Sequence, residues 1–148
     1  MRLVSLAVAA LAGASMAVQG VLNSVLGKKV GSLEASFIVH VTGAVLLGSI
    51  LLSGLSQGSL KRAPAAPWYS FFGGPLSILI IWGVLTSVGR VGVSAANTAI
   101  VAAQIVTALL LDILGASGQK FSFGWLQALG ATLLIAGTYL LLSNRAGR

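Results

Sequence analysis

No charged side chain interrupts residues 3–27, which read LVSLAVAALAGASMAVQGVLNSVLG. A helix needs about 20 mostly apolar residues to cross the hydrocarbon core of a bilayer. Four more stretches without a charge follow, at residues 35–60, 63–89, 91–111 and 121–144. Every Lys, Arg, Asp and Glu of the chain lies between or outside these stretches. The spacing of the charges therefore predicts five membrane-spanning segments.

The composition excludes a water-soluble fold. Of the 148 residues, 57% are hydrophobic and 7% are charged, whereas a soluble domain carries about 25% charged residues. Spanning strands would need short segments of alternating polarity, which the sequence lacks, and an unpaired backbone in lipid is costly. We therefore predict an all-α integral membrane protein. The first segment also has features of a secretory signal, but it is longer than the 7–15 apolar residues of a signal, which favours a retained helix.

The chain is predicted to be one transmembrane domain, residues 1–148, with its helices separated by glycine-rich turns. Residues 27–31 and 89–92 are expected to form tight turns, and residues 55–67 the longest connection. A kink or an open turn is expected at Gly73-Gly74-Pro75. The predicted helices cover residues 3–26, 33–54, 68–88, 93–114 and 124–143.

The basic residues are divided almost equally between the two sides of the membrane, so they specify orientation weakly. One side receives four of them and the other five: Arg2, Lys61, Arg62 and Lys120 against Lys28, Lys29, Arg90, Arg145 and Arg148. Either the Lys28-Lys29 pair decides the orientation, or the chain inserts both ways (dual topology) and pairs with an inverted copy. Many secondary transporters consist of inverted repeats around a midplane site, and five helices cannot divide into equal halves. A transporter of this kind would take its second half from another chain.

The net charge of +7 has a simple explanation in lipid. The basic residues are spread over short termini and loops, which is typical of contacts with phospholipid headgroups rather than with nucleic acid. With two carboxylates, one histidine and no cysteine, the chain offers no metal cluster and no catalytic triad. It also has no phosphate-binding loop. We therefore expect neither an enzyme nor a bound cofactor or metal.

Four amide side chains fall inside the apolar stretches. Gln19 and Asn23 are four residues apart and share a helix face, and Asn97 and Gln104, seven apart, share another. Unpaired polar groups in hydrocarbon are costly, so these should face the bundle interior or a cavity. They either line a substrate cavity or join helices by hydrogen bonds, and the sequence leaves both possibilities open.

Three titratable residues are candidates for proton coupling. They are Glu34, His40 and Asp112. Each also has a structural explanation: Glu34 as an interfacial residue near the basic turn, His40 as a packed side chain and Asp112 as the end of its helix. Histidine titrates in the range that suits a proton-coupled step.

Small residues recur along the first predicted helix. Ser5, Ala9, Gly13 and Ala17 are spaced by four, and Gly20 and Ser24 repeat the spacing. In lipid such positions allow helices to approach closely, because hydrophobicity supplies no force between helices there. The pattern predicts a tightly packed first helix and says nothing of a substrate.

Several stretches together resemble one transporter family. The run QGVLNSVLG at 19–27, followed by a basic turn and Ala35-Ser-Phe, resembles the opening of the YdcZ-like branch of the drug/metabolite transporter superfamily. Pro67-Trp68, Gly73-Gly74 and the run AQIVTALLLDILG at 103–115 are similar to its middle and fourth helix. The run LGATLLIAG at 129–137 is similar to its last helix. Order and spacing agree over essentially the whole chain.

The resemblance implies a small secondary transporter, an exporter, in the bacterial inner membrane. It implies half of a ten-helix inverted-repeat bundle, completed by a second copy or a paired homologue. Gln19, Asn23, Gln104 and Asp112 are the positions that match its pattern, whereas Ala103 replaces a glycine and His40 replaces an apolar residue. With so few acids, a neutral or amphipathic solute is a more natural cargo than a polycation. The alternative is a non-transporting membrane subunit whose first and fourth helices bind another protein.

Overall fold

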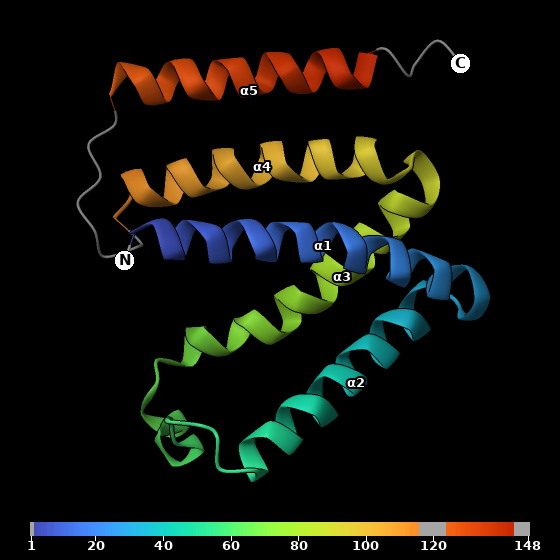
Figure 1. Ribbon diagram of the computed structural model, residues 1–148, viewed down its shortest axis with the longest axis vertical. Helices are drawn as coiled ribbons and strands as arrows, with labels where there is room; N and C mark the ends of the chain where they lie inside the picture. The colour runs from blue at the N-terminus through green and yellow to red at the C-terminus, as the bar shows by residue number, and fades with distance from the viewer. Residues whose placement is uncertain (1, 116–123, 144–148) are drawn as a thin grey trace. The chain divides into compact units, whose positions relative to one another are not determined.

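The computed structural model describes residues 2–115 and 124–143, and this part of the chain is helical with no strand. Five of its helices are long and apolar enough to cross a membrane, which confirms the prediction of an all-α membrane protein with five spanning helices. They are α1 (Arg2–Val30), α2 (Ser32–Leu52), α3 (Gly73–Val91), α4 (Val93–Ile113) and α5 (Trp125–Ser143), and two short 3-10 helices, η1 (Leu60–Ala65) and η2 (Trp68–Phe72), precede α3 (Figure 1).

The chain divides into two compact units, residues 1–90 and 91–148. The first unit contains α1, α2 and nearly all of α3, and α1 packs along α2. The second contains α4 and α5, which pack along each other. Lys120, Arg145 and Arg148, counted above for orientation, lie outside the described residues.

The turns between helices are shorter than the sequence predicted. The helix α1 continues through Lys28 and Lys29 to Val30, and the chain reverses at Gly31, whose φ is 103°. The Gly31 N–H still donates to the Gly27 carbonyl at 2.9 Å, so the α-helical hydrogen-bond pattern extends to Gly31 itself. Gly92, with φ 84°, likewise separates α3 from α4 along the chain. Only glycine adopts this left-handed backbone without strain, so one glycine is enough for each break.

The kink expected at residues 73–75 is the start of a helix instead. The 3-10 helix η2 ends at Phe72, and α3 begins at Gly73. Pro75 therefore lies in the first turn of α3, where its missing N–H removes no intrahelical hydrogen bond. The predicted helix start at residue 68 is where the helical span begins, with η2 running directly into α3.

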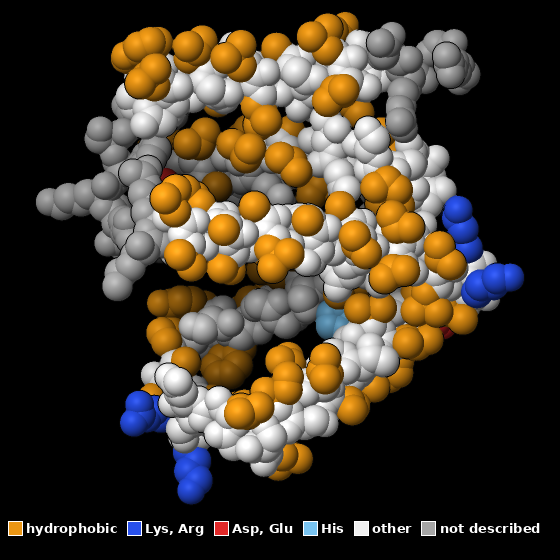
Figure 2. All heavy atoms as spheres, viewed as in Figure 1, with side chains coloured by type: hydrophobic (Ala, Val, Ile, Leu, Met, Phe, Trp, Pro, Cys, Tyr) orange, Lys and Arg blue, Asp and Glu red, His pale blue; other side chains and the backbone are white. Residues whose placement is uncertain are grey.

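The described helices bury very little of their apolar surface. The buried hydrophobic residues are Ala35, Leu85, Val88 and Ala96, whereas Leu52 in α2 is 91% exposed. Figure 2 shows hydrophobic side chains along the helices and Lys and Arg side chains at helix ends and in loops. Such a surface is stable only against hydrocarbon or another apolar protein surface.

The helices α1 and α3 approach closely where α1 has glycine. A Cβ added at Gly27 would lie 2.9 Å from Leu85 Cδ1, and one added at Gly20 would lie 3.0 Å from Val84 Cγ1. The second half of the small-residue pattern thus packs against α3, as predicted. A Cβ at Gly13, in the first half, would have no described atom within 4 Å.

A matched pair of glycine substitutions tests this contact. Gly27→Val should lower the free energy of unfolding in detergent by about 1–3 kcal/mol, because its methyl groups overpack the space beside Leu85. Gly43→Val, on α2 where no described atom lies within 4 Å of the added Cβ, should change it by less than half as much. Equal losses for the two variants would contradict the close approach of α1 and α3.

Candidate functional site

A groove of about 390 Å³ runs between α4 and α5 in the second unit. Its polar groups come from Asn97 and Thr98 on α4 and Thr138 on α5. The Thr98 hydroxyl donates to the Ser94 carbonyl of its own helix at 2.7 Å, whereas no described residue hydrogen-bonds the Asn97 amide or the Thr138 hydroxyl. The rest of the lining is apolar, from Val101, Leu134, Gly137 and Leu141.

Glycine keeps this groove open. Gly137 faces it from α5, and a Cβ added there would have no described atom within 4 Å. A larger side chain at this position would fill space that a solute can now occupy. Asn97 is half-buried at the wall of the groove, so its amide is shielded from lipid while remaining free to bind.

The four predicted amides are placed differently. Asn97 lines the groove, but Gln104, two turns further along α4, is exposed and does not line it. In the first unit Gln19 is exposed and Asn23 is 6% exposed. Because Gln19 and Asn23 belong to one unit and Asn97 and Gln104 to the other, their assembly into one cavity stays a prediction.

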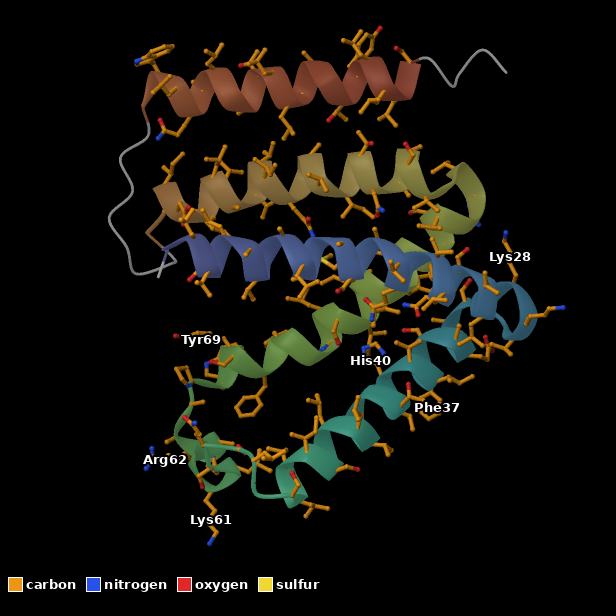
Figure 3. The ribbon with its side chains drawn as sticks, in the orientation of Figure 1. Lys28, Phe37, His40, Lys61, Arg62 and Tyr69 are labelled. Atoms are coloured by element: carbon orange, nitrogen blue, oxygen red, sulfur yellow. The ribbon has the colours of Figure 1, made fainter. Side chains whose placement is uncertain are left out.

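His40 joins α2 to α3. Its Nε2 lies 2.9 Å from the Ser77 hydroxyl on α3, and its Nδ1 lies 2.7 Å from the Ser36 carbonyl one turn earlier on α2. The Ser77 hydroxyl in turn donates to the Gly74 carbonyl at 2.7 Å. Figure 3 shows the imidazole between the two helices. No charged partner takes part in these three bonds.

The number of hydrogens in this chain of bonds depends on the charge of His40. A carbonyl only accepts, so Nδ1 must carry a hydrogen to bond Ser36. If the single hydroxyl hydrogen of Ser77 goes to Gly74, Nε2 must also donate, and the imidazole is then a cation. With a neutral imidazole the Ser77 hydrogen can serve Nε2 or Gly74 but not both. Protonation of His40 therefore turns Nε2 from acceptor to donor in its bond to Ser77 and leaves the Ser77 hydrogen for the Gly74 carbonyl.

The two acidic candidates lie at helix ends and form no ion pair among the described residues. The Glu34 carboxylate folds back over Gly31 at the start of α2, where the partial positive charge of the helix N-terminus stabilises an anion. Asp112 is in the last turn of α4, just before the reversal at Gly115. Proton coupling by either residue stays a prediction.

The sequence did not reveal a second cavity, of about 190 Å³, in the first unit. It is lined from α1, α2 and α3, chiefly by Ser24, Gly27, Lys28, Ser32, Thr86 and Arg90. Ser24 was predicted from the small-residue pattern to be a helix-packing position, and no role was predicted for Thr86. Thr86 and Arg90 are four residues apart and so share a face of one helix. This spacing of a hydroxyl and a cation could have indicated a polar site.

These features define a class: a multi-pass membrane protein with a solute-sized groove and charges at the helix ends. Residues 4–140 match the family described as "Putative inner membrane exporter, YdcZ". The chain therefore belongs to the YdcZ exporter family and is a multi-pass protein of the inner membrane. This family is one of transporters rather than of enzymes. No curated protein and no solved structure matches the chain.

The bond between His40 and Ser77 can be tested by a double-mutant cycle. Ser77→Ala should lower the free energy of unfolding in detergent by about 1 kcal/mol, because it leaves Nε2 of His40 without its partner. Adding His40→Leu should restore most of the loss, since both polar groups are then gone. Ser49→Ala is the control, because the Ser49 hydroxyl donates to its own helix. A loss no larger for Ser77→Ala than for Ser49→Ala would contradict the bond.

Proposed function

We propose that the chain exports a small neutral or amphipathic solute, as one half of a dimeric secondary transporter. The observation that carries this proposal is the groove between α4 and α5, with an unbonded amide and an unbonded hydroxyl in apolar walls. Membership of an exporter family supports it. The substrate class follows from the lining of the groove.

The groove suits a solute that is mostly apolar and has one or two hydrogen-bonding groups. Its volume of about 390 Å³ falls within the range of about 300–1,000 Å³ for small-molecule sites. Asn97 offers both a donor and an acceptor, and Thr138 a hydroxyl. No Lys, Arg, Asp or Glu of the described residues lines the groove, so the described lining offers no charge to compensate that of an ion.

The dimer is proposed because the described helices leave so much apolar surface uncovered. The family match covers residues 4–140, and the five helices within it are proposed as one half of the transporter. A second chain inserted the other way, or a paired homologue, would complete a ten-helix inverted repeat around a midplane site. Lipid would cover the faces that remain outward.

His40 is proposed as the proton-exchanging group. Its Nε2 bonds Ser77 across to α3, and protonation would make this nitrogen the donor of that bond, whereas a proton-driven carrier needs a protonation step that favours one conformation over another. Among the described residues, neither Glu34 nor Asp112 forms a hydrogen bond or ion pair to a second helix. Of the three acid–base candidates, His40 therefore has the strongest structural support.

The alternative function, a non-transporting subunit, has no comparable support. The family is described as an exporter family, which supports transport and not a purely structural part. An exposed helix face alone does not identify a protein partner, because lipid covers such a face equally well.

The dimer proposal predicts two orientations for a chain expressed alone. A reporter active only in the cytoplasm and one active only in the periplasm, each fused to the C-terminus, should both give signals well above background. Removing one basic residue changes the nearly even balance between the two sides. Lys61→Gln and Arg90→Gln should therefore shift the ratio of the two reporter signals in opposite directions. Signal from one reporter alone would contradict dual insertion and leave a paired homologue as the second half.

The groove and His40 are tested by solute-driven proton flux in inverted membrane vesicles. A panel of neutral and amphipathic solutes is added while a pH-sensitive dye reports the proton gradient. Asn97→Leu should slow the flux by about tenfold or more, because the groove loses its amide. His40→Leu should abolish proton flux while solute binding persists.

The control for this experiment is Thr132→Val on α5, whose hydroxyl donates to its own helix and lies outside the groove. It should leave the flux unchanged. Wild-type flux in the Asn97→Leu variant, at equal expression, would overturn the assignment of the groove as the substrate site.

A further inference from the structure

The second cavity, of about 190 Å³, lies where α1 ends, α2 begins and α3 ends. Lys28 reaches it from the last turn of α1, Ser32 from the first residue of α2 and Arg90 from the last turn of α3. Figure 3 shows the Lys28 side chain projecting from this end of α1. All of these residues belong to the first unit.

Two hydroxyl groups at the cavity lack hydrogen-bond partners. Ser24 is 5% exposed, lines the cavity and hydrogen-bonds no described residue. The Thr86 hydroxyl oxygen also has no partner among the described residues, but it is fully buried and cannot be reached from the cavity. An unsatisfied hydroxyl destabilises the fold. The Ser24 hydroxyl would gain a bond if an acceptor occupied the cavity.

The charges around the cavity favour an anion. Lys28 and Arg90 stand at its rim, and no described carboxylate lines it. The helix α2 starts beside the cavity at Ser32, and the Glu34 carboxylate lies over Gly31 at this helix N-terminus. Three basic side chains, those of Lys28, Lys29 and Arg90, stand against this one carboxylate, so a positive excess remains.

We propose that this cavity binds a phosphate group, carried by a phospholipid headgroup or by a soluble phosphate. A phosphate group presents mainly acceptor oxygens, and the cavity offers donors from the Ser24 and Ser32 hydroxyls, one ammonium and one guanidinium, which can bond two phosphate oxygens at once. The volume is below that of most drug-sized sites and suits a compact group. The inference is independent of the proposed export function.

The position of the cavity indicates the structural role of a bound phosphate. It lies at the ends of spanning helices that carry basic residues, at the depth where lipid phosphates meet such residues. A bound phosphate would tie α1, α2 and α3 together at this end, because each helix supplies at least one donor. It would thereby hold this end of the unit at one membrane surface.

The experiment uses the full-length protein in a phosphate-free maltoside detergent and has two arms. The first measures thermal unfolding against inorganic phosphate, with chloride at equal ionic strength as reference. The second measures retention of short-chain phosphatidylglycerol by native mass spectrometry, with a glucosyl diacylglycerol of equal chain length as the phosphate-free reference. Binding in the first arm identifies a soluble phosphate as sufficient, and binding in the second alone identifies the lipid as the source.

The variants separate this site from general charge attraction. Ser24→Ala removes the cavity hydroxyl and should weaken phosphate binding about fivefold, whereas Arg90→Gln should weaken it about tenfold or more. Their controls are Ser49→Ala, whose hydroxyl bonds its own helix, and Lys61→Gln in η1, and neither should alter binding. If Arg90→Gln fails to fold, Ser24→Ala decides alone.

Two results would overturn the proposal. One is the absence of any effect of phosphate or phosphatidylglycerol, beyond their references, on the wild-type protein. The other is a loss of binding as large in Lys61→Gln as in Arg90→Gln, or as large in Ser49→Ala as in Ser24→Ala. Neither result would bear on export, because no arm measures transport.

Discussion

The structure depends on one constraint: a peptide backbone in hydrocarbon must satisfy its own hydrogen bonds. The five charge-free stretches place the chain in lipid, and the helix is the form in which a single segment meets the constraint alone. Once each segment is self-sufficient, the helices need few contacts with one another, which is why only Ala35, Leu85, Val88 and Ala96 are buried hydrophobic residues in the described chain. Cohesion then comes from close approach at glycine, as at Gly20 and Gly27, and from the bond between His40 and Ser77.

The number and order of the helices could be predicted because both depend on the positions of charges along the sequence. Their boundaries could not be predicted equally well. The run Gly27-Lys-Lys-Val-Gly31 contains two glycines, and composition does not say which of them reverses the chain. The helical bond from the Gly31 N–H to the Gly27 carbonyl decides it. At the start of α3 the sequence showed Pro75 but not that η2 would end at Phe72, so a helix start was interpreted as a kink.

The candidate sites were predictable only as far as they depend on one helix. The polarity of Asn97 within an apolar stretch marked it, but its neighbour Thr138 is on another helix and the sequence does not fix the register between them. His40 and Ser77 are 37 residues apart, so their bond was likewise out of reach. The cavity at Thr86 and Arg90 was missed for the same reason, since it exists only where three helices end together.

The hydroxyl groups of the chain show where function can lie. Those of Thr42, Ser49, Thr98 and Thr132 donate to carbonyls of their own helices. Because these hydroxyls already donate within one helix, their burial in lipid carries little energetic penalty and their hydrogens are not available to a ligand. The Asn97 amide and the Thr138 and Ser24 hydroxyls have no such partner among the described residues and line cavities, whereas the unpartnered hydroxyl oxygens of Ser36 and Thr86 are fully buried. In lipid a ligand, water or another chain must complete an accessible polar group, so binding is to be sought first at the groups that line cavities.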